Sequence, residues 1–216
     1  MPVGNAQAGP VFTIVETQTL APIIGNYPAV QIVSIPQFDP SNGTLLFAVV
    51  RITANYDALI QAENIGQSSA IISAMSTQTI QVTPPPFVAP MPLNDMQIIP
   101  LQSNPVAPFD GVLNFMGPSS TSFTYTPVNP REVLLADVTR DPMDVGFANF
   151  IGLGSFDFGI NGLGEFTVSS NTGAVSAKAN LAIGATIEVE YHYVPEPATL
   201  AMLLPGLALI RRRRPR

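Results

Sequence analysis

The sequence predicts an all-β protein, namely an antiparallel, jelly-roll-like β-sandwich of roughly ten short strands followed by a short apolar C-terminal helix. Three observations support this prediction. The 22 prolines and 16 glycines leave little room for long helices. Apolar residues gather in short β-branched and aromatic runs separated by turn residues. Residues 186–193 alternate strictly between apolar and polar, which is typical of a half-buried antiparallel strand.

The front of the chain combines strand-like runs with a well-defined turn. The strand candidates are residues 11–17, 31–35 and 44–52. A turn is expected at residues 39–43, because Pro40 presets φ and Asn42-Gly43 accepts positive φ. Both faces of 44–52 are mostly apolar, so we expect this strand at the centre of a sheet, covered on both sides.

The middle of the chain has a less regular pattern. Residues 58–67 are consistent with either a short helix or a pair of strands broken at Gly66, and 70–75 and 77–83 have strand composition. Residues 84–108 contain eight prolines, a composition that excludes a central strand. We expect an extended crossover or a long edge loop there, with a boundary between two domains as the alternative.

Short strand candidates return in the last part of the body. They are residues 111–116, 122–126, 131–138, the aromatic stretch within 147–160, and residues 164–170, 175–181 and 186–193. A turn at 171–173 separates two of them.

The charge of the chain is unevenly distributed. Of nine basic residues five lie at 211–216, so residues 1–193 keep four basic residues against 14 acidic ones, a net charge of −10. An acidic body repels phosphate backbones, and we therefore expect no nucleic-acid partner. The chain has no cysteine, which excludes disulfides, thiolate catalysis and cysteine-ligated metal centres.

Motifs of known chemistry are scarce. His192 is the single histidine, and it lies on the polar face of a strand without a Gly-x-Ser-x-Gly elbow elsewhere. Asp137, Asp141 and Asp144 form an acidic cluster that is a weak calcium candidate, although turn-forming and solvated carboxylates are the simpler interpretation. We expect no enzyme and no required cofactor. A hydrolase with an acidic pair is the least favoured alternative.

The C-terminal segment differs from the rest of the chain. Residues 198–210 are apolar, and as a helix they would span about 20 Å, short of the roughly 30 Å hydrocarbon core. The stems of Arg211, Arg212, Arg213 and Arg214 would narrow that gap, and their charges would stay cytoplasmic. A transmembrane helix is expected, and a buried core helix with a basic end is the alternative.

The C-terminal segment resembles the PEP-CTERM sorting signal of Gram-negative bacteria in the order of its three parts. These are Val194-Pro195-Glu196-Pro197, an apolar stretch and an arginine block. The resemblance implies a membrane transpeptidase, an exosortase, as the processing partner, transient anchoring in the inner membrane and delivery to the cell surface. Proteins of this group usually carry a signal peptide. Ala6-Gln7-Ala8 fits the signal-peptidase pattern, so residues 1–10 are expected to be a remnant of that region or a chance match.

The body more weakly resembles choice-of-anchor E domains, through PQFDPSNGTLLFAVVRI at 36–52 and ATIEVEYHYVPEP at 185–197. That resemblance carries implications for the architecture of the domain and for its location in the cell, and it implies no established activity. The expected organisation is a β-sandwich at 11–193 and a sorting signal at 194–216. The expected function is that of a secreted, surface-sorted structural or interaction protein of the exopolysaccharide or biofilm extracellular matrix. A carbohydrate- or calcium-binding extracellular module is the alternative.

Overall fold

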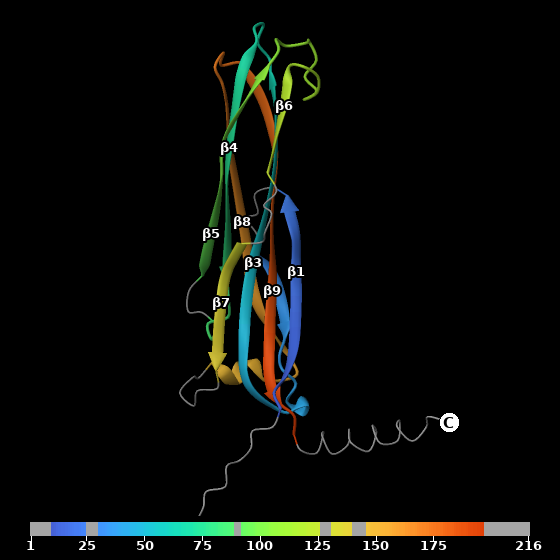
Figure 1. Ribbon diagram of the computed structural model, residues 1–216, viewed down its shortest axis with the longest axis vertical. Coiled ribbons are helices and arrows are strands. Elements are labelled where there is room, and N and C mark those ends of the chain that lie inside the picture. The colour runs from blue at the N-terminus through green and yellow to red at the C-terminus, as the bar shows by residue number, and fades with distance from the viewer. Residues whose placement is uncertain (1–9, 25–29, 89–91, 126–130, 140–145, 197–216) are drawn as a thin grey trace, which may run out of the picture.

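The protein is a long sandwich of two antiparallel β-sheets, which confirms the all-β prediction (Figure 1). The computed structural model describes residues 10–24, 30–88, 92–125, 131–139 and 146–196. Within these residues the chain forms nine strands and two short 3-10 helices. We call the end of the sandwich where β9 finishes the base, and the opposite end, where β3 finishes, the tip.

The first sheet has β3 and β9 at its centre. Its strand order is β1-β9-β3-β6, and β7 also pairs with β3. Its strands are β1 (Phe12–Ile24), β3 (Thr44–Asn64), β6 (Ser120–Tyr125), β7 (Arg131–Thr139) and β9 (Val175–Val194). β7 pairs with the half of β3 nearer the base, and β6 pairs with the half nearer the tip. The two short strands therefore share one edge of β3.

The second sheet has the strand order β2-β8-β4-β5. Its strands are β2 (Gln31–Pro36), β4 (Ala70–Thr83), β5 (Leu93–Val106) and β8 (Ser155–Ser170). The 3-10 helices η1 (Pro40–Asn42) and η2 (Phe147–Phe150) lie at the base (Figure 1). The described ranges contain no helix with the length and hydrophobicity that a membrane span requires.

The main hydrophobic core lies between the sheets in the half nearer the base. Every second residue of β3 points inward there, and Val50, Ile52 and Ala54 are fully buried. Ile187 and Val189 of β9 repeat this pattern beside them. Phe156 and Phe158 of β8 close the core from the second sheet. This burial of every second residue matches the alternation of apolar and polar residues from which the sequence predicts strands.

The prediction of short strands was wrong, because several predicted segments merge. Residues 44–52 and 58–67 belong largely to the single 21-residue strand β3, so the helix alternative for 58–67 was wrong as well. Likewise, 70–75 and 77–83 form β4, and 175–181 and 186–193 form β9. Alternate burial continues through each junction, so glycine and polar residues there do not end the strand.

Two further segments differ from expectation. Residues 93–106 are not a loop but the edge strand β5, which holds Pro100 and Pro105. An edge strand tolerates proline because one of its sides has no ladder partner. Conversely, the apolar residues 111–116 form a loop rather than a strand. Their backbone N–H groups bond to the side chains of Glu63, Asp110 and Asn114 instead of to a neighbouring strand.

Candidate functional site

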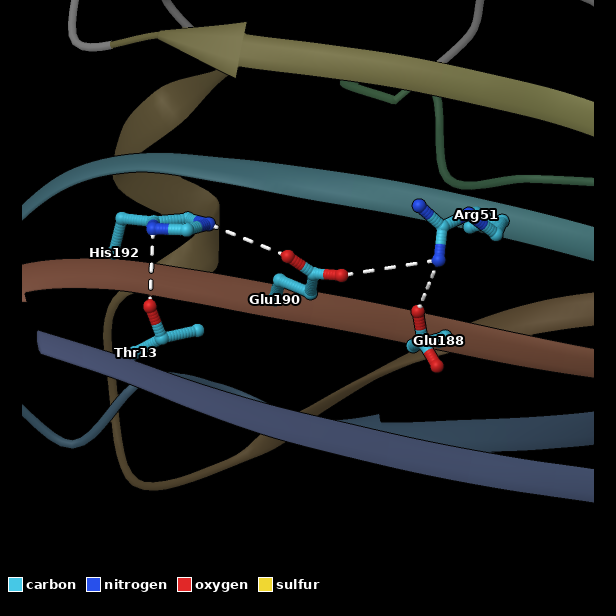
Figure 2. A network of polar contacts seen from close by, with 5 residues as sticks. All are labelled: Thr13, Arg51, Glu188, Glu190 and His192. Carbon is cyan, nitrogen blue, oxygen red and sulfur yellow. Dashed lines mark hydrogen bonds and ion pairs between the residues drawn. The ribbon is translucent and has the colours of Figure 1, made fainter.

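The outer face of β9 carries a polar network that leads toward the predicted sorting motif (Figure 2). Arg51 of β3 forms an ion pair with Glu188 at 2.7 Å and lies 3.8 Å from Glu190. Glu190 in turn lies 3.4 Å from Nε2 of His192. The Thr13 hydroxyl of β1 is 3.1 Å from Nδ1 of His192. The network therefore joins β1, β9 and β3, and cross-strand pairs of this kind fix the register of a sheet.

His192, which the sequence placed on a polar strand face, is held on three sides. Its ring stacks on Phe47 with 4.1 Å between the ring centroids, and Thr13 and Glu190 contact its two nitrogens. A hydroxyl, an imidazole and a carboxylate in this order also occur in hydrolytic triads. Here, however, Glu190 is shared with Arg51 and the side chains stand on an outer sheet face. The arrangement favours a structural tie between strands.

A pocket of about 440 Å³ opens at the base, directly beside the point where β9 ends. Its walls come from η1, from the start of β3 and from η2, and the carboxylate-bearing Glu196 lies at its margin. The lining residues are Phe38, Pro40, Gly43, Thr44, Leu45, Phe147, Ala148, Ile151 and Glu196. We call this cavity the base pocket. It is mostly apolar, with one charged group at the edge.

Gly43 holds the exit of the chain against the base. Its φ of 142° lies in a region that side chains rarely adopt. A Cβ atom there would collide with the Val194 carbonyl oxygen and would lie 2.7 Å from Cα of Pro195. The turn that the sequence predicted at 39–43 thus packs directly against the start of the predicted sorting motif. The two stretches that carry the choice-of-anchor resemblance meet at this contact.

The turn itself is fixed by its first residue. Asp39 caps η1, and its Oδ1 accepts a hydrogen bond from the Ser41 backbone N–H at 2.8 Å. The hydrogen bonds from Ser41 hold the pKa of Asp39 below its usual value, because they favour the ionised form. The cap keeps the η1 wall of the base pocket in place.

Aromatic side chains fill the sandwich above the base pocket. The rings of Phe38 and Tyr193 lie 5.2 Å apart, and Phe38 also contacts Tyr191. The Tyr191 hydroxyl donates to the Pro36 carbonyl oxygen at 2.7 Å, which joins the first sheet to the second. Burial, with a smaller contribution from the charge of Glu16, raises the pKa of Tyr191 above its usual value. Strand β9 therefore ends in a rigid, well-packed region.

The structure describes part of the predicted sorting motif. Val194 is the last residue of β9, and Pro195 and Glu196 come next at the base, with Glu196 exposed. Pro197 and the arginines at 211–214 lie outside the described residues, as do residues 1–9. The described part of the motif therefore consists of Val194, Pro195 and Glu196.

The predicted calcium cluster falls largely outside the described residues as well. Asp137 lies on β7 opposite Val49, whereas Asp141 and Asp144 lie outside the described residues. Among the residues that the structure describes, no group of three histidine, cysteine or acidic side chains is arranged to hold a metal ion. The calcium prediction stays untested.

Sequence reasoning missed two features. The base pocket joins residues near positions 40, 147 and 196, and no local pattern signals such a contact. The second feature is Glu63, a fully buried carboxylate at the tip end of β3. No local signal marks it, because Glu63 alternates with the inward-facing Ile60 and Ala62, and a period of two places it on the outward face of the strand.

Comparisons with known proteins give little guidance. No family model matches the chain, and no curated protein matches it. Solved structures match weakly. A chain of the Mud crab tombus-like virus is 8% identical over 91% of this chain and 96% of its own length, with a TM-score of 0.25. Chains of the T13 IBDV viral particle and of the infectious bursal disease virus Gx strain are 6% and 9% identical, with TM-scores of 0.18 and 0.16.

The last two matches cover 92% and 90% of this chain but only 44% of the viral chains, so this chain spans less than half of their length. TM-scores of this size carry no argument about function.

Proposed function

We propose that this chain is an exported structural protein of a Gram-negative bacterial surface, delivered by a PEP-CTERM sorting signal at residues 194–216. An exosortase is the proposed processing partner. The folded body would act in the exopolysaccharide or biofilm matrix. The observation that carries the proposal is the position of Pro195 and Glu196, which follow β9 without any spacer and leave the domain at its base, with Glu196 exposed.

Physical arguments support a transient membrane anchor. The 13 apolar residues 198–210 come close to the length that a bilayer core requires once the arginine stems are added. The arginines at 211–214 would remain in the cytoplasm, which places the acidic body on the other side. A cysteine-free chain folds without any need for disulfide formation, which suits export.

The proposed fold in finer detail is a jelly roll. In that fold two Greek keys wrap so that the first strand lies next to the last in one sheet and the second lies next to the penultimate in the other. The orders β1-β9-β3-β6 and β2-β8-β4-β5 follow this rule, with β6 and β7 sharing the place of one strand. A rigid jelly roll without a required cofactor suits a structural role.

The proposal is tested by the intact mass and the terminal peptides of the protein recovered from its own cells. Membrane, surface and culture-medium fractions are compared. The expected mature form ends near Pro197. In cells that lack the exosortase, and in a Pro195→Ala/Pro197→Ala variant, the protein should stay in the membrane fraction at its unprocessed mass. Surface or released protein that still ends at Arg216 would refute the sorting proposal.

A further inference from the structure

Large apolar side chains are exposed around the point where the chain leaves the sandwich. Leu153, in the loop between η2 and β8, is 85% exposed, and Val11 and Phe12, at the start of β1, are 53% and 41% exposed. The start of β1, the end of β9 and the loop before β8 all lie at the base (Figure 1). We call these three residues the base rim. Exposed apolar residues that gather at one end of a domain are typical of an interaction surface.

Both parts of the base rim adjoin the exit of the chain. The Phe12 ring lies 6.0 Å from the ring of Tyr193, which is close to the end of β9. Ile151, two residues before Leu153, lines the base pocket together with Glu196. The exposed apolar side chains therefore lie on either side of the segment that leaves the domain.

The loop that carries Leu153 is held in one conformation by Gln37. Nε2 of Gln37 donates to the Asn149 carbonyl oxygen at 2.8 Å, and its Oε1 accepts from the Gly154 N–H at 3.0 Å. A Cβ atom at Gly152 would collide with the same Oε1, so a larger residue there would displace Gln37. An ordered backbone that presents Leu153 to solvent loses little entropy when the side chain binds.

The number of residues beyond Glu196 limits how far the base can lie from a membrane. Pro197 is the single residue between Glu196 and the apolar segment 198–210. Two residue steps extend by at most ~7 Å. The headgroup layer on each side of a bilayer is itself about 5–8 Å thick. With residues 198–210 in the hydrocarbon core, as the proposed function requires, the base therefore lies in the headgroup layer.

The charges of the base indicate which kind of lipid surface it fits. The described acidic side chains there are Asp39 beside η1, Asp157 near the start of β8 and Glu196 at the exit. The cation Arg51 lies on the outer sheet face, where it pairs with Glu188. Acidic groups repel anionic lipids, whereas the ammonium groups of zwitterionic headgroups attract them. The base therefore fits a zwitterionic surface.

We propose that the base rim is a membrane-contact surface, with Leu153, Val11 and Phe12 inserted in the headgroup layer of a zwitterionic bilayer that the C-terminal segment spans. Burial of one leucine side chain shifts such an equilibrium by roughly tenfold. The contact rests on the proposed membrane anchor. It adds that the body stands on the bilayer through its base, so that the tip of the sandwich points away from the membrane.

A single fluorophore tests this contact, because the chain contains no tryptophan. The full chain, with its C-terminal segment, is reconstituted in phosphatidylcholine vesicles with and without bromine on the acyl chains. Bromine quenches tryptophan only at close contact. Leu153→Trp places the fluorophore on the base rim, and Leu113→Trp, at a residue that is 53% exposed at the tip, is the control. We expect blue-shifted emission and about twofold quenching or more for Leu153→Trp, as for a side chain in the headgroup layer, and neither for Leu113→Trp.

A second set of variants shows whether Leu153 holds the base on the lipid. Val11→Trp reports from the other part of the base rim. Its quenching should fall by about half or more when Leu153→Glu is added, because the bilayer excludes a charge, and Leu153→Met should preserve it. Ile98→Glu, at an exposed apolar position on β5 away from the base, should leave the quenching unaltered. Phosphatidylglycerol in the vesicles should lower the quenching, and high salt should restore it.

The outcomes separate this contact from the anchor on which it rests. Flotation of the vesicles shows independently whether the full chain is anchored, and a chain that does not float with them would refute both. A chain that floats, but in which Leu153→Trp is quenched no more than Leu113→Trp, would overturn the base contact alone. Undiminished quenching of Val11→Trp in the Leu153→Glu background, or stronger quenching in anionic vesicles, would overturn it as well.

Discussion

At the scale of single residues, the Tyr191 hydroxyl forms a direct hydrogen bond between the two sheets near the base. It donates to the Pro36 carbonyl oxygen at 2.7 Å, and the ring around it is almost fully buried. Tyr191→Phe keeps the ring and deletes this bond. We expect the free energy of unfolding to fall by about 1 kcal/mol. Chemical denaturation at neutral pH measures the change, and an unaltered midpoint would show that the bond contributes nothing.

The same residue predicts how stability responds to alkaline pH. Burial raises the pKa of Tyr191 in the folded state, whereas the unfolded chain releases the phenolic proton near its ordinary pKa of 10.0. The stabilisation is therefore fully present below pH 10 and is lost as the pH rises from there toward the folded pKa. When the pH is raised from 9 to 11, the denaturation midpoint of Tyr191→Phe should fall less than that of the unaltered chain. Equal slopes would contradict the assignment to Tyr191.

Gly43 gives a third prediction at this scale. Gly43→Ala adds a Cβ atom against the backbone of Val194 and Pro195, and backbone atoms cannot rotate away as a side chain would. We expect a loss of about 1–3 kcal/mol in stability and faster proteolysis near the end of β9. Gly111→Ala is the matched control, since it also has a positive φ but open space around it. Similar losses in both variants would mean that strain, not the contact with the motif, is responsible.

At the scale of elements, Glu63 decides the conformation of the loop at residues 109–119, between β5 and β6. Glu63→Gln replaces one carboxylate oxygen with an NH₂ group, which then faces a donor in the loop. We expect stability to fall by about 2–4 kcal/mol, because buried donors lose a charged acceptor. Hydrogen exchange of the Asn114 and Phe115 amides should accelerate. As a control, Glu165→Gln at an exposed position on β8 should change neither the stability nor the exchange rates. If the Asn114 and Phe115 amides of Glu63→Gln exchange as slowly as those of the unaltered chain, other bonds hold the loop.

The elements also show what periodicity reveals and where it stops. Alternation located most strands, because each strand has one face in the core and the period of two is a property of the backbone. The ends of the strands were harder to predict from the sequence. The sequence left residues 161–163 between two strand candidates, yet β8 continues through them, because Ile183 and Leu181 of β9 pack into the space that the missing side chains of Gly162 and Gly164 leave. Such packing is a tertiary contact that the local sequence does not contain.

At the scale of the whole molecule, the sequence contains the residues of the predicted sorting motif but does not show what surrounds them. Val194-Pro195-Glu196 was readable as a contiguous pattern. The base pocket was not, because its walls come from residues 38–45, residues 147–151 and Glu196, which meet only through the Phe38–Ile151 bridge and the pairing of β3 with β9. The same pairing sets the distance between the base and the tip. Features that depend on pairing over the full length of the sandwich therefore need the structure.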